Sequence, residues 1–179
     1  MTTDYSAPIT AKSPPINANG WLAFGIALLV LSVDQLSKAW ILYGLHLGLG
    51  DSIRILPILS LTGVENIGVT FGLLRADTAV GRVLLSLFAV GVTVALGLWA
   101  RKAERRLTAI ALGMIMGGAL GNNLIDRVRL GHVTDFIDVT GLGFFPWVFN
   151  IADACIDIGI ALLLFETFRP QAKPAAPQA

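Results

Sequence analysis

Four long apolar stretches, separated by shorter polar or mixed segments, dominate the pattern of hydrophobic and polar positions along the chain. They cover residues 21–43, 79–100, 107–125 and 151–168. Each is close to the roughly 20 helical residues that a hydrocarbon core of about 30 Å requires. The pattern predicts an all-α membrane protein with four transmembrane helices, and we assign one membrane domain to residues 21–168.

The segment between the first two stretches, about residues 45–75, has a different pattern. Charged residues interrupt it, so it does not indicate a further membrane span. Short apolar and β-branched runs, such as residues 53–56 and 59–62, are typical of strands. We therefore expect a small β-sheet here, on the outer surface of the membrane.

The third stretch carries a regular pattern of small residues. Gly113, Gly117 and Gly121 recur every four positions, so they lie on one face of a helix. A face of this kind lets another helix approach closely. We expect it to serve packing rather than chemistry.

A short basic loop between the second and third stretches determines the expected orientation. It reads Arg101-Lys102-Ala103-Glu104-Arg105-Arg106. Cytoplasmic loops of membrane proteins are enriched in Lys and Arg. The loop and both termini are therefore expected in the cytoplasm, with segments 44–78 and 126–150 on the outer side.

The two ends of the chain differ from the apolar region between them. Residues 1–20 contain three prolines among Ser, Thr and Asn, and residues 169–179 are also rich in proline. Segments of this composition bury too little apolar surface to fold, so we expect two disordered cytoplasmic tails. The first apolar stretch has no small-residue cleavage pattern, which favours a retained helix over a removable signal peptide.

Composition supports a membrane location and narrows the chemistry. The 179 residues are 55% hydrophobic and only 14% charged, which is far too apolar for a soluble domain of this size. The formal net charge is +1, so no general attraction to nucleic acid is expected. One cysteine, Cys155, and two histidines, His46 and His132, do not make a metal-ligand spacing. We expect neither a metal nor another cofactor.

Ionisable side chains within the predicted helices are candidates for function, because an unpaired charge inside a membrane is costly. Asp34 and Lys38 are four residues apart, so they share a helix face and can neutralise each other. Asn123 and Arg127 have the same spacing, and arginine can hold a carboxylate or a backbone carbonyl through two contacts. Spacing alone leaves purely structural roles open for both pairs.

Aspartates also lie among apolar residues at the expected outer boundary of the membrane, at Asp135 and Asp153. Two carboxylates in a poorly hydrated site can share one proton. One can then take a proton from water while the other polarises or protonates a peptide carbonyl, which is peptidase chemistry without a cofactor. Asp138 and Asp157 lie close by in the chain, and spacing does not choose among the four.

Five short blocks between Asp34 and Asp153 form a pattern specific to one family. They are Asp34-Gln35-Leu36-Ser37-Lys38, Glu65-Asn66-Ile67-Gly68-Val69-Thr70-Phe71-Gly72, Gly117 to Arg127, Gly131-His132-Val133-Thr134-Asp135-Phe136, and Phe149 to Ala154. With these blocks in this order, the chain resembles the lipoprotein signal peptidases, also called signal peptidase II. The resemblance implies four transmembrane helices, a periplasmic β-cradle, and a short helix or loop that closes over the site.

The same resemblance implies an activity and a substrate. The chain would be an aspartic endopeptidase of the bacterial inner membrane, with Asp135 and Asp153, and not Asp138 or Asp157, as its catalytic pair. Its substrate would be a prolipoprotein whose lipobox cysteine carries a diacylglyceryl group, cut just before that cysteine. Apart from this substrate and membrane lipids, no partner is expected, and the protein would act as a monomer.

The resemblance also implies residues that shape the pocket and hold the substrate or the catalytic pair. They are Asp34, Lys38, Asn66, Asn123, Arg127 and Asn150. The family pattern is Gly-Asn-x-x-Asp-Arg, whereas residues 121–127 contain one residue more. Because Asn123 keeps the four-residue spacing to Arg127, we expect Asn123 to take the asparagine position and Asn122 to point elsewhere.

A proton-coupled carrier or small channel is the alternative from another class of function. Its relay would use Asp34, Lys38, Asp135 and Asp153. A carrier site is expected near the membrane midplane between internal repeats. The chain shows no visible repeat, and these groups gather toward one side, which favours the peptidase.

Overall fold

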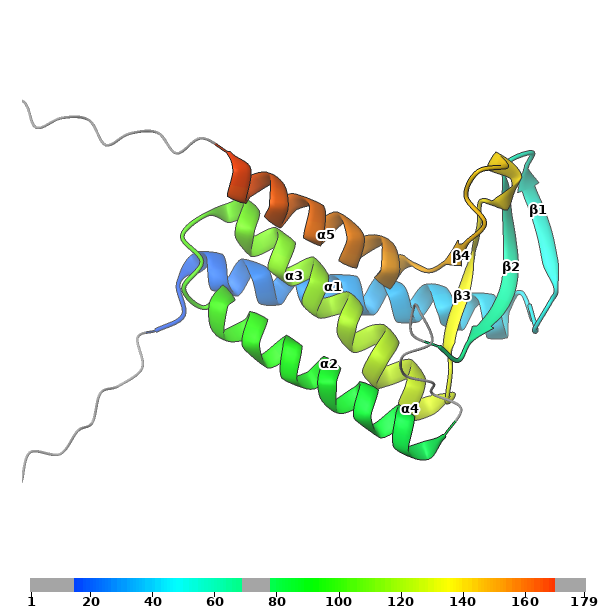
Figure 1. Ribbon diagram of the computed structural model, residues 1–179, viewed down its shortest axis with the longest axis horizontal. Coiled ribbons are helices and arrows are strands. Elements are labelled where there is room, and N and C mark those ends of the chain that lie inside the picture. Colours follow the sequence, from blue (N-terminus) through cyan, green and yellow to red (C-terminus); the bar gives the residue numbers. More distant parts are fainter. Residues whose placement is uncertain (1–14, 69–77, 170–179) are drawn as a thin grey trace, which may run out of the picture.

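The computed structural model describes residues 15–68 and 78–169. Most of the two predicted tails, and residues 69–72 of the second sequence block, lie outside these ranges. Within them, a bundle of helices carries a small antiparallel sheet at one end (Figure 1).

Four long helices form the bundle. They are α1 (Ala18–Ala39), α2 (Ala79–Ala100), α3 (Arg106–Leu120) and α5 (Ile151–Phe168). Two of them continue as π-helices, α1 into η1 (Trp40–Gly44) and α3 into η2 (Gly121–Asp126), which leads into the short α4 (Arg127–Arg129).

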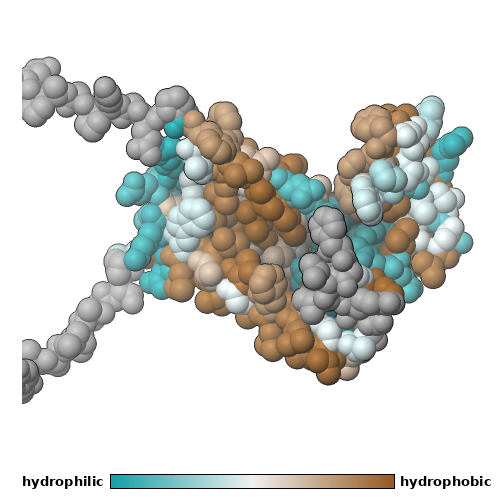
Figure 2. All heavy atoms as spheres, viewed as in Figure 1, coloured by the Kyte–Doolittle hydropathy of each residue, from teal (hydrophilic) through white to brown (hydrophobic). Residues whose placement is uncertain are grey.

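Three continuous helical runs in the described part of the chain are long and apolar enough to cross a membrane. They are Ala18–Gly44, Ala79–Ala100 and Arg106–Arg129. α5 has 18 residues and packs along α3, but it carries Asp153, Asp157 and Glu166. Hydrophobic surface runs along the bundle, whereas hydrophilic residues gather at the end where α1 begins and over the outer part of the sheet (Figure 2). The chain thus has the character of a membrane protein, and a fourth span at α5 stays a prediction.

α1 begins at Ala18 rather than at the predicted Trp21, because Asn17 caps it. The Asn17 side-chain oxygen accepts a hydrogen bond from the Gly20 backbone N–H at 2.7 Å. The amide of Asn17 also donates to the backbone oxygen of Ala103 at 3.0 Å. The predicted tail therefore ends before residue 18, and the start of α1 is tied to the basic loop between α2 and α3.

Glycines on α3 bring α1 close to it. A Cβ atom at Gly113 would lie 2.5 Å from the backbone oxygen of Ala23, and one at Gly117 would lie 2.5 Å from that of Ala27. Real Cβ atoms essentially never come that close. The prediction of a helix-packing face at these positions is confirmed.

The sheet has the strand order β1-β2-β3-β4, with every neighbouring pair antiparallel. Its strands are β1 (Ser52–Leu56), β2 (Leu59–Asn66), β3 (Val133–Asp138) and β4 (Val148–Phe149). The first two confirm the strands predicted from the apolar runs. The other two come from the second outer segment, where no strand was predicted. Ile41, Leu47 and Phe136 form a buried apolar cluster that joins η1 to β3.

Candidate active site

Asp135 and Asp153 come from two elements that meet where the sheet joins the bundle. Asp135 is the third residue of β3, and Asp153 is the third residue of α5. β4 leads through Asn150 directly into α5. Both aspartates line one cavity of about 860 Å³, which we call the dyad cavity. Its other walls include Asn66, Gly68, Phe145, Trp147, Phe149, Ile156, Asp157 and Ile158.

Asn150 holds the two aspartates together. Its side-chain oxygen caps α5 by accepting a hydrogen bond from the Asp153 N–H at 2.9 Å, and the Asn150 N–H donates back to Asp153 Oδ2 at 3.3 Å. The Nδ2 of the same side chain donates to Asp135 Oδ1 at 2.6 Å. Only a side chain with both an acceptor and a donor can make both contacts. Asn150 is fully buried, so this bridge is fixed.

Asn66 supplies a second donor to Asp135. Its Nδ2 lies 3.0 Å from Asp135 Oδ2, and its Oδ1 accepts from the Gly68 N–H at 3.1 Å. The pairing of β2 with β3 sets this contact, because Asn66 lies opposite Val133 at the end of the ladder. Each oxygen of Asp135 therefore accepts one side-chain amide.

The environment of Asp135 favours its protonated form. Burial and the nearby charge of Asp153 raise the pKa of Asp135 from its ordinary 3.8 to about 6. The hydrogen bonds from Asn66 and Asn150, and the charge of Lys38, act in the opposite direction. A carboxyl with this pKa beside a second carboxylate can hold a proton that the pair shares.

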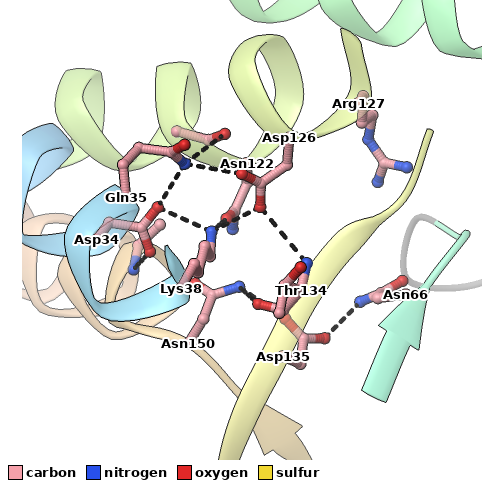
Figure 3. A network of polar contacts seen from close by, with 12 residues as sticks. Asp34, Gln35, Lys38, Asn66, Asn122, Asp126, Arg127, Thr134, Asp135 and Asn150 are labelled. Atoms are coloured by element: carbon pink, nitrogen blue, oxygen red, sulfur yellow. Dashed lines mark hydrogen bonds and ion pairs between the residues drawn. The ribbon is translucent and has the colours of Figure 1, made fainter. Parts of the chain in front are cut away.

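A buried polar network adjoins the pair and centres on Lys38 (Figure 3). The Lys38 Nζ contacts Asp34 Oδ2 at 2.8 Å, Asp126 Oδ2 at 2.8 Å and Asn122 Oδ1 at 2.6 Å. Asp34 Oδ1 accepts from the Ala152 N–H at 3.0 Å, one residue before Asp153. The shared face of Asp34 and Lys38 is as predicted, and the lysine also reaches across to η2.

Asn122 connects this network to the catalytic candidates. Its Nδ2 donates to Asp153 Oδ1 at 2.7 Å, so the expectation that Asn122 points elsewhere is wrong. Asn123 instead accepts from Arg127 Nε at 3.2 Å. The spacing argument assumed an α-helix, whereas residues 121–126 form a π-helix, in which one extra residue fits into a turn.

Arg127 holds backbone rather than either aspartate. Its Nη2 donates to the backbone oxygen of Gly68 at 3.1 Å, just beyond Asn66. Its side chain lines a neighbouring pocket between α2 and α4, together with Ser86 and Val90, and not the dyad cavity. Of the two alternatives expected for this arginine, the structure shows contact with a backbone carbonyl, made by one N–H rather than two.

The other two aspartates take different places. Asp138 lies at the far end of β3, where hydrogen bonds from Thr140 and Thr62 lower its pKa. Asp157 lines the dyad cavity one turn beyond Asp153. The Asn150 side chain contacts the Asp135 carboxyl and the Asp153 N–H, and within the described ranges it makes no such hydrogen bond to Asp138 or Asp157. The geometry thus brings together Asp135 and Asp153, the pair that the resemblance implies.

Sequence reasoning missed Asn122, Gln35 and Asp126 as members of the polar network. Gln35 donates to Asp126 Oδ1 at 2.7 Å, and Asp126 Oδ2 in turn accepts from the Thr134 N–H at 3.4 Å. Their signal was present, because Gln35 and Asp126 are polar residues inside the matched blocks. In the described ranges, no three His, Cys, Asp or Glu side chains group in a way that could hold a metal ion.

Comparison with known proteins gives the family. The family model described as "Signal peptidase (SPase) II" matches residues 26–169. The chain belongs to the signal peptidase II family. The lipoprotein signal peptidase of Caulobacter vibrioides is 51% identical over 153 residues, which are 86% of this chain and 90% of that protein. The lipoprotein signal peptidase of Methylorubrum extorquens is 40% identical over 153 residues, which are 85% of this chain and 88% of that protein.

A solved structure supports the same conclusion. A bacterial membrane enzyme determined by the in meso method at 2.3 Å resolution is 30% identical, with a TM-score of 0.71 over 86% of this chain and 94% of that one. The resemblance seen in the five sequence blocks is confirmed. As a member of the signal peptidase II family, the chain is an aspartic peptidase and not a carrier.

Proposed function

We propose that this membrane peptidase removes signal peptides from prolipoproteins, with Asp135 and Asp153 as its catalytic pair, by cutting before the diacylglyceryl-modified lipobox cysteine. The observation that carries the choice of residues is the Asn150 side chain, which binds both aspartates at the wall of one cavity. The names of the relatives, lipoprotein signal peptidases, support the substrate class.

The reaction begins with one carboxyl of the pair protonated and the other ionised. The ionised carboxylate takes a proton from water as the water oxygen bonds to the carbonyl carbon of the scissile peptide. The carbonyl oxygen takes the proton of the other carboxyl, which gives a neutral gem-diol. No charge builds up on the substrate, because both proton transfers accompany the attack.

The second step cleaves the bond. The carboxyl that received the water proton passes it to the departing nitrogen, and the C–N bond breaks. A gem-diol hydroxyl returns its proton to the other carboxylate. The products are a carboxyl group on the signal peptide and a free amine on the cysteine, and the pair regains its starting protonation.

The walls of the dyad cavity suit an apolar substrate. Phe145, Trp147 and Phe149 form its sheet side, and Ile156 and Ile158 continue along α5. A signal helix can lie along α5 while its scissile bond reaches Asp153 at the first turn of that helix. The lipid chains of the modified cysteine would lie against the aromatic side chains. Asn66 would orient the substrate backbone, and Arg127 would act through its hydrogen bond to Gly68 at the cavity wall.

The membrane placement follows from charge and from the site. We place α5 as the fourth span in the inner membrane, with the sheet and the dyad cavity on the periplasmic side. The loop 101–106, with four basic residues, lies at the opposite end and would face the cytoplasm with both termini. We further propose that the protein acts as a monomer.

Cleavage of a diacylated lipopeptide in detergent micelles tests the proposal. Asp135→Asn and Asp153→Asn should each abolish turnover, since either variant removes one of the two proton-transfer groups. Asp138→Asn is the matched control, because it changes a carboxylate on the same strand that lies away from the cavity, and it should retain activity. Cleavage by both single variants of the pair would refute the assignment.

A further inference from the structure

The hydrogen bonds of Lys38 can be arranged in only one way. An ammonium group has three N–H donors and no acceptor, and three oxygens lie within 2.8 Å of Lys38 Nζ. They belong to Asp34, Asp126 and Asn122. Lys38 is only 3% exposed, so water does not compete for these positions.

The lysine therefore sets the orientation of one amide. Asn122 must turn its oxygen toward Lys38, because Lys38 cannot accept a hydrogen bond. Its NH₂ group then points to the other side, where it donates to Asp153 Oδ1 at 2.7 Å. Asn122 is 4% exposed, so water does not compensate for the two hydrogen bonds that a flipped amide would lose.

We infer that Lys38 and Asn122 are positioning residues that make Asp153 the ionised member of the pair, the base that accepts the proton of water, and leave the proton on Asp135. This inference rests on the proposed function and adds to it a fixed direction of proton transfer. A donor that cannot turn away stabilises a carboxylate and disfavours its protonated form. Asp135 also accepts two side-chain donors, so the number of donors alone does not rank the two carboxyls, and the place of each group in the fold contributes the difference.

The place of Asp153 on α5 acts in the same direction. Asp153 lies in the first turn of the helix, and its Oδ2 accepts from the Asn150 N–H at the helix start. Negative charge is stabilised at the N-terminus of a helix. Asp135 lies on a strand, which has no comparable dipole.

Other charged groups also surround Asp153 and influence its protonation. They are Asp135 on β3, Asp34 and Lys38 on α1, Asp126 on η2, and Asp157 on α5 itself. The charge of Lys38 acts on Asp153 directly, although two carboxylates at 2.8 Å offset part of it. The orientation of Asn122 is the second route, and the double-variant cycle below separates the two.

The pH dependence of kcat/KM separates the two possible directions. A singly protonated pair gives a bell-shaped profile. The position of the acid limb reports the pKa of the base, and that of the alkaline limb reports the pKa of the proton donor. Asn122→Ala removes a donor to Asp153 and should shift the acid limb to higher pH by about one unit. Asn66→Ala removes a donor to Asp135 and should raise the alkaline limb instead. The opposite pattern would overturn the inference.

An isosteric pair of variants controls for folding and for charge. Asn122→Asp keeps an acceptor for Lys38 but places a carboxylate against Asp153, so it should raise the acid limb further than Asn122→Ala. Asn123→Asp adds the same charge one residue away, where the side chain contacts Arg127, and should leave the acid limb in place. Equal shifts in both variants would show a general charge effect and refute the specific role of Asn122.

The role of Lys38 is tested by a cycle that keeps the local charge constant. The double variant Lys38→Met with Asp34→Asn removes one ammonium and one carboxylate together. It should raise the acid limb when Asn122 is present and have no further effect in the Asn122→Ala protein. An equal shift in both backgrounds would show that Lys38 acts independently of Asn122.

The assay distinguishes failure of this inference from failure of the proposed function. If the wild-type protein does not cleave the diacylated lipopeptide, the proposed function is refuted. If it does and the acid limb of Asn122→Ala is unmoved, the inference is refuted. For variants too slow to profile, the pH dependence of binding a statine-containing peptide gives the same limbs, because such an analogue also requires the singly protonated pair.

Discussion

Replacing Asp135 by Asn should stabilise the protein at neutral pH, although it removes a proposed catalytic group. The pKa of Asp135 lies at about 6 in the folded protein against an ordinary 3.8, because of burial and the charge of Asp153. The folded state therefore holds this proton more tightly than the unfolded state. Wild-type stability falls as the pH rises from about 4 to about 6, and the loss is complete above that range.

The magnitude follows from the shift. A difference of about 2.2 pH units corresponds to about 3 kcal/mol, and Asp135 is only 2% exposed, so solvent screens it little. In the variant, the oxygen of the new amide can still accept from Asn150, but its NH₂ group faces the donor of Asn66. The lost hydrogen bond costs about 1 kcal/mol, so the expected net stabilisation is about 2 kcal/mol at pH 8.

Thermal unfolding in detergent micelles, followed by the fluorescence of the four tryptophans, measures this effect. A change of about 2 kcal/mol corresponds to a Tm rise of roughly 4–8 °C for a chain of this size. The rise should appear between pH 4 and pH 7 and vanish at pH 4. A Tm difference that is the same at every pH, or a variant less stable than wild type at pH 8, would refute the reasoning.

Asp138→Asn is a matched control, for which the expected change in stability at neutral pH has the opposite sign. Hydrogen bonds from Thr140 and Thr62 lower the pKa of Asp138, so its ionised form stabilises the folded state above its ordinary pKa. This contribution is lost as the pH falls through the lowered value. The variant should therefore be less stable than wild type at neutral pH and approach it under acid conditions.

Two further predictions concern packing and the bridge between the aspartates. Gly117→Leu should lower the Tm measurably, because even a Cβ atom there would lie 2.5 Å from the backbone oxygen of Ala27. Gly25→Leu is the control and should have little effect, because a Cβ atom at Gly25 meets nothing within 4 Å. Asn150→Ser should retain much of the cap of α5 but lose the donor to Asp135. The kcat in the lipopeptide assay should therefore fall by more than tenfold, while the Tm changes by only a few degrees. A kcat close to wild type would contradict the bridging role.

Hydropathy predicted the helices well, because a membrane span is recognised from length and composition alone. The range 79–100 agrees with α2, and 151–168 agrees with α5. The strands β1 and β2 were predicted from local runs that pair with each other through a tight turn. β3 was missed because its partner is distant in the chain, with Val64 opposite Asp135, and a single strand has little local signal.

In the candidate site, too, local spacing predicted some contacts and missed others. The spacing of Asp34 and Lys38 predicted their contact, because a regular α-helix relates residues four apart. It failed for Asn123, because the π-helix over residues 121–126 changes which side chains share a face. The choice of Asp135 and Asp153 among four aspartates needed the family blocks or the three-dimensional bridge, since charge and spacing do not show which carboxylates meet.

The bridge by Asn150 has a consequence for how the enzyme becomes active. The same side chain starts α5 and binds the carboxyl of Asp135 on the sheet. Helix initiation and alignment of the two proposed catalytic groups therefore depend on one side chain. If Asp135 and Asp153 are the catalytic pair, a chain that has inserted its helices but not docked its sheet has no aligned pair and is inactive until the sheet docks.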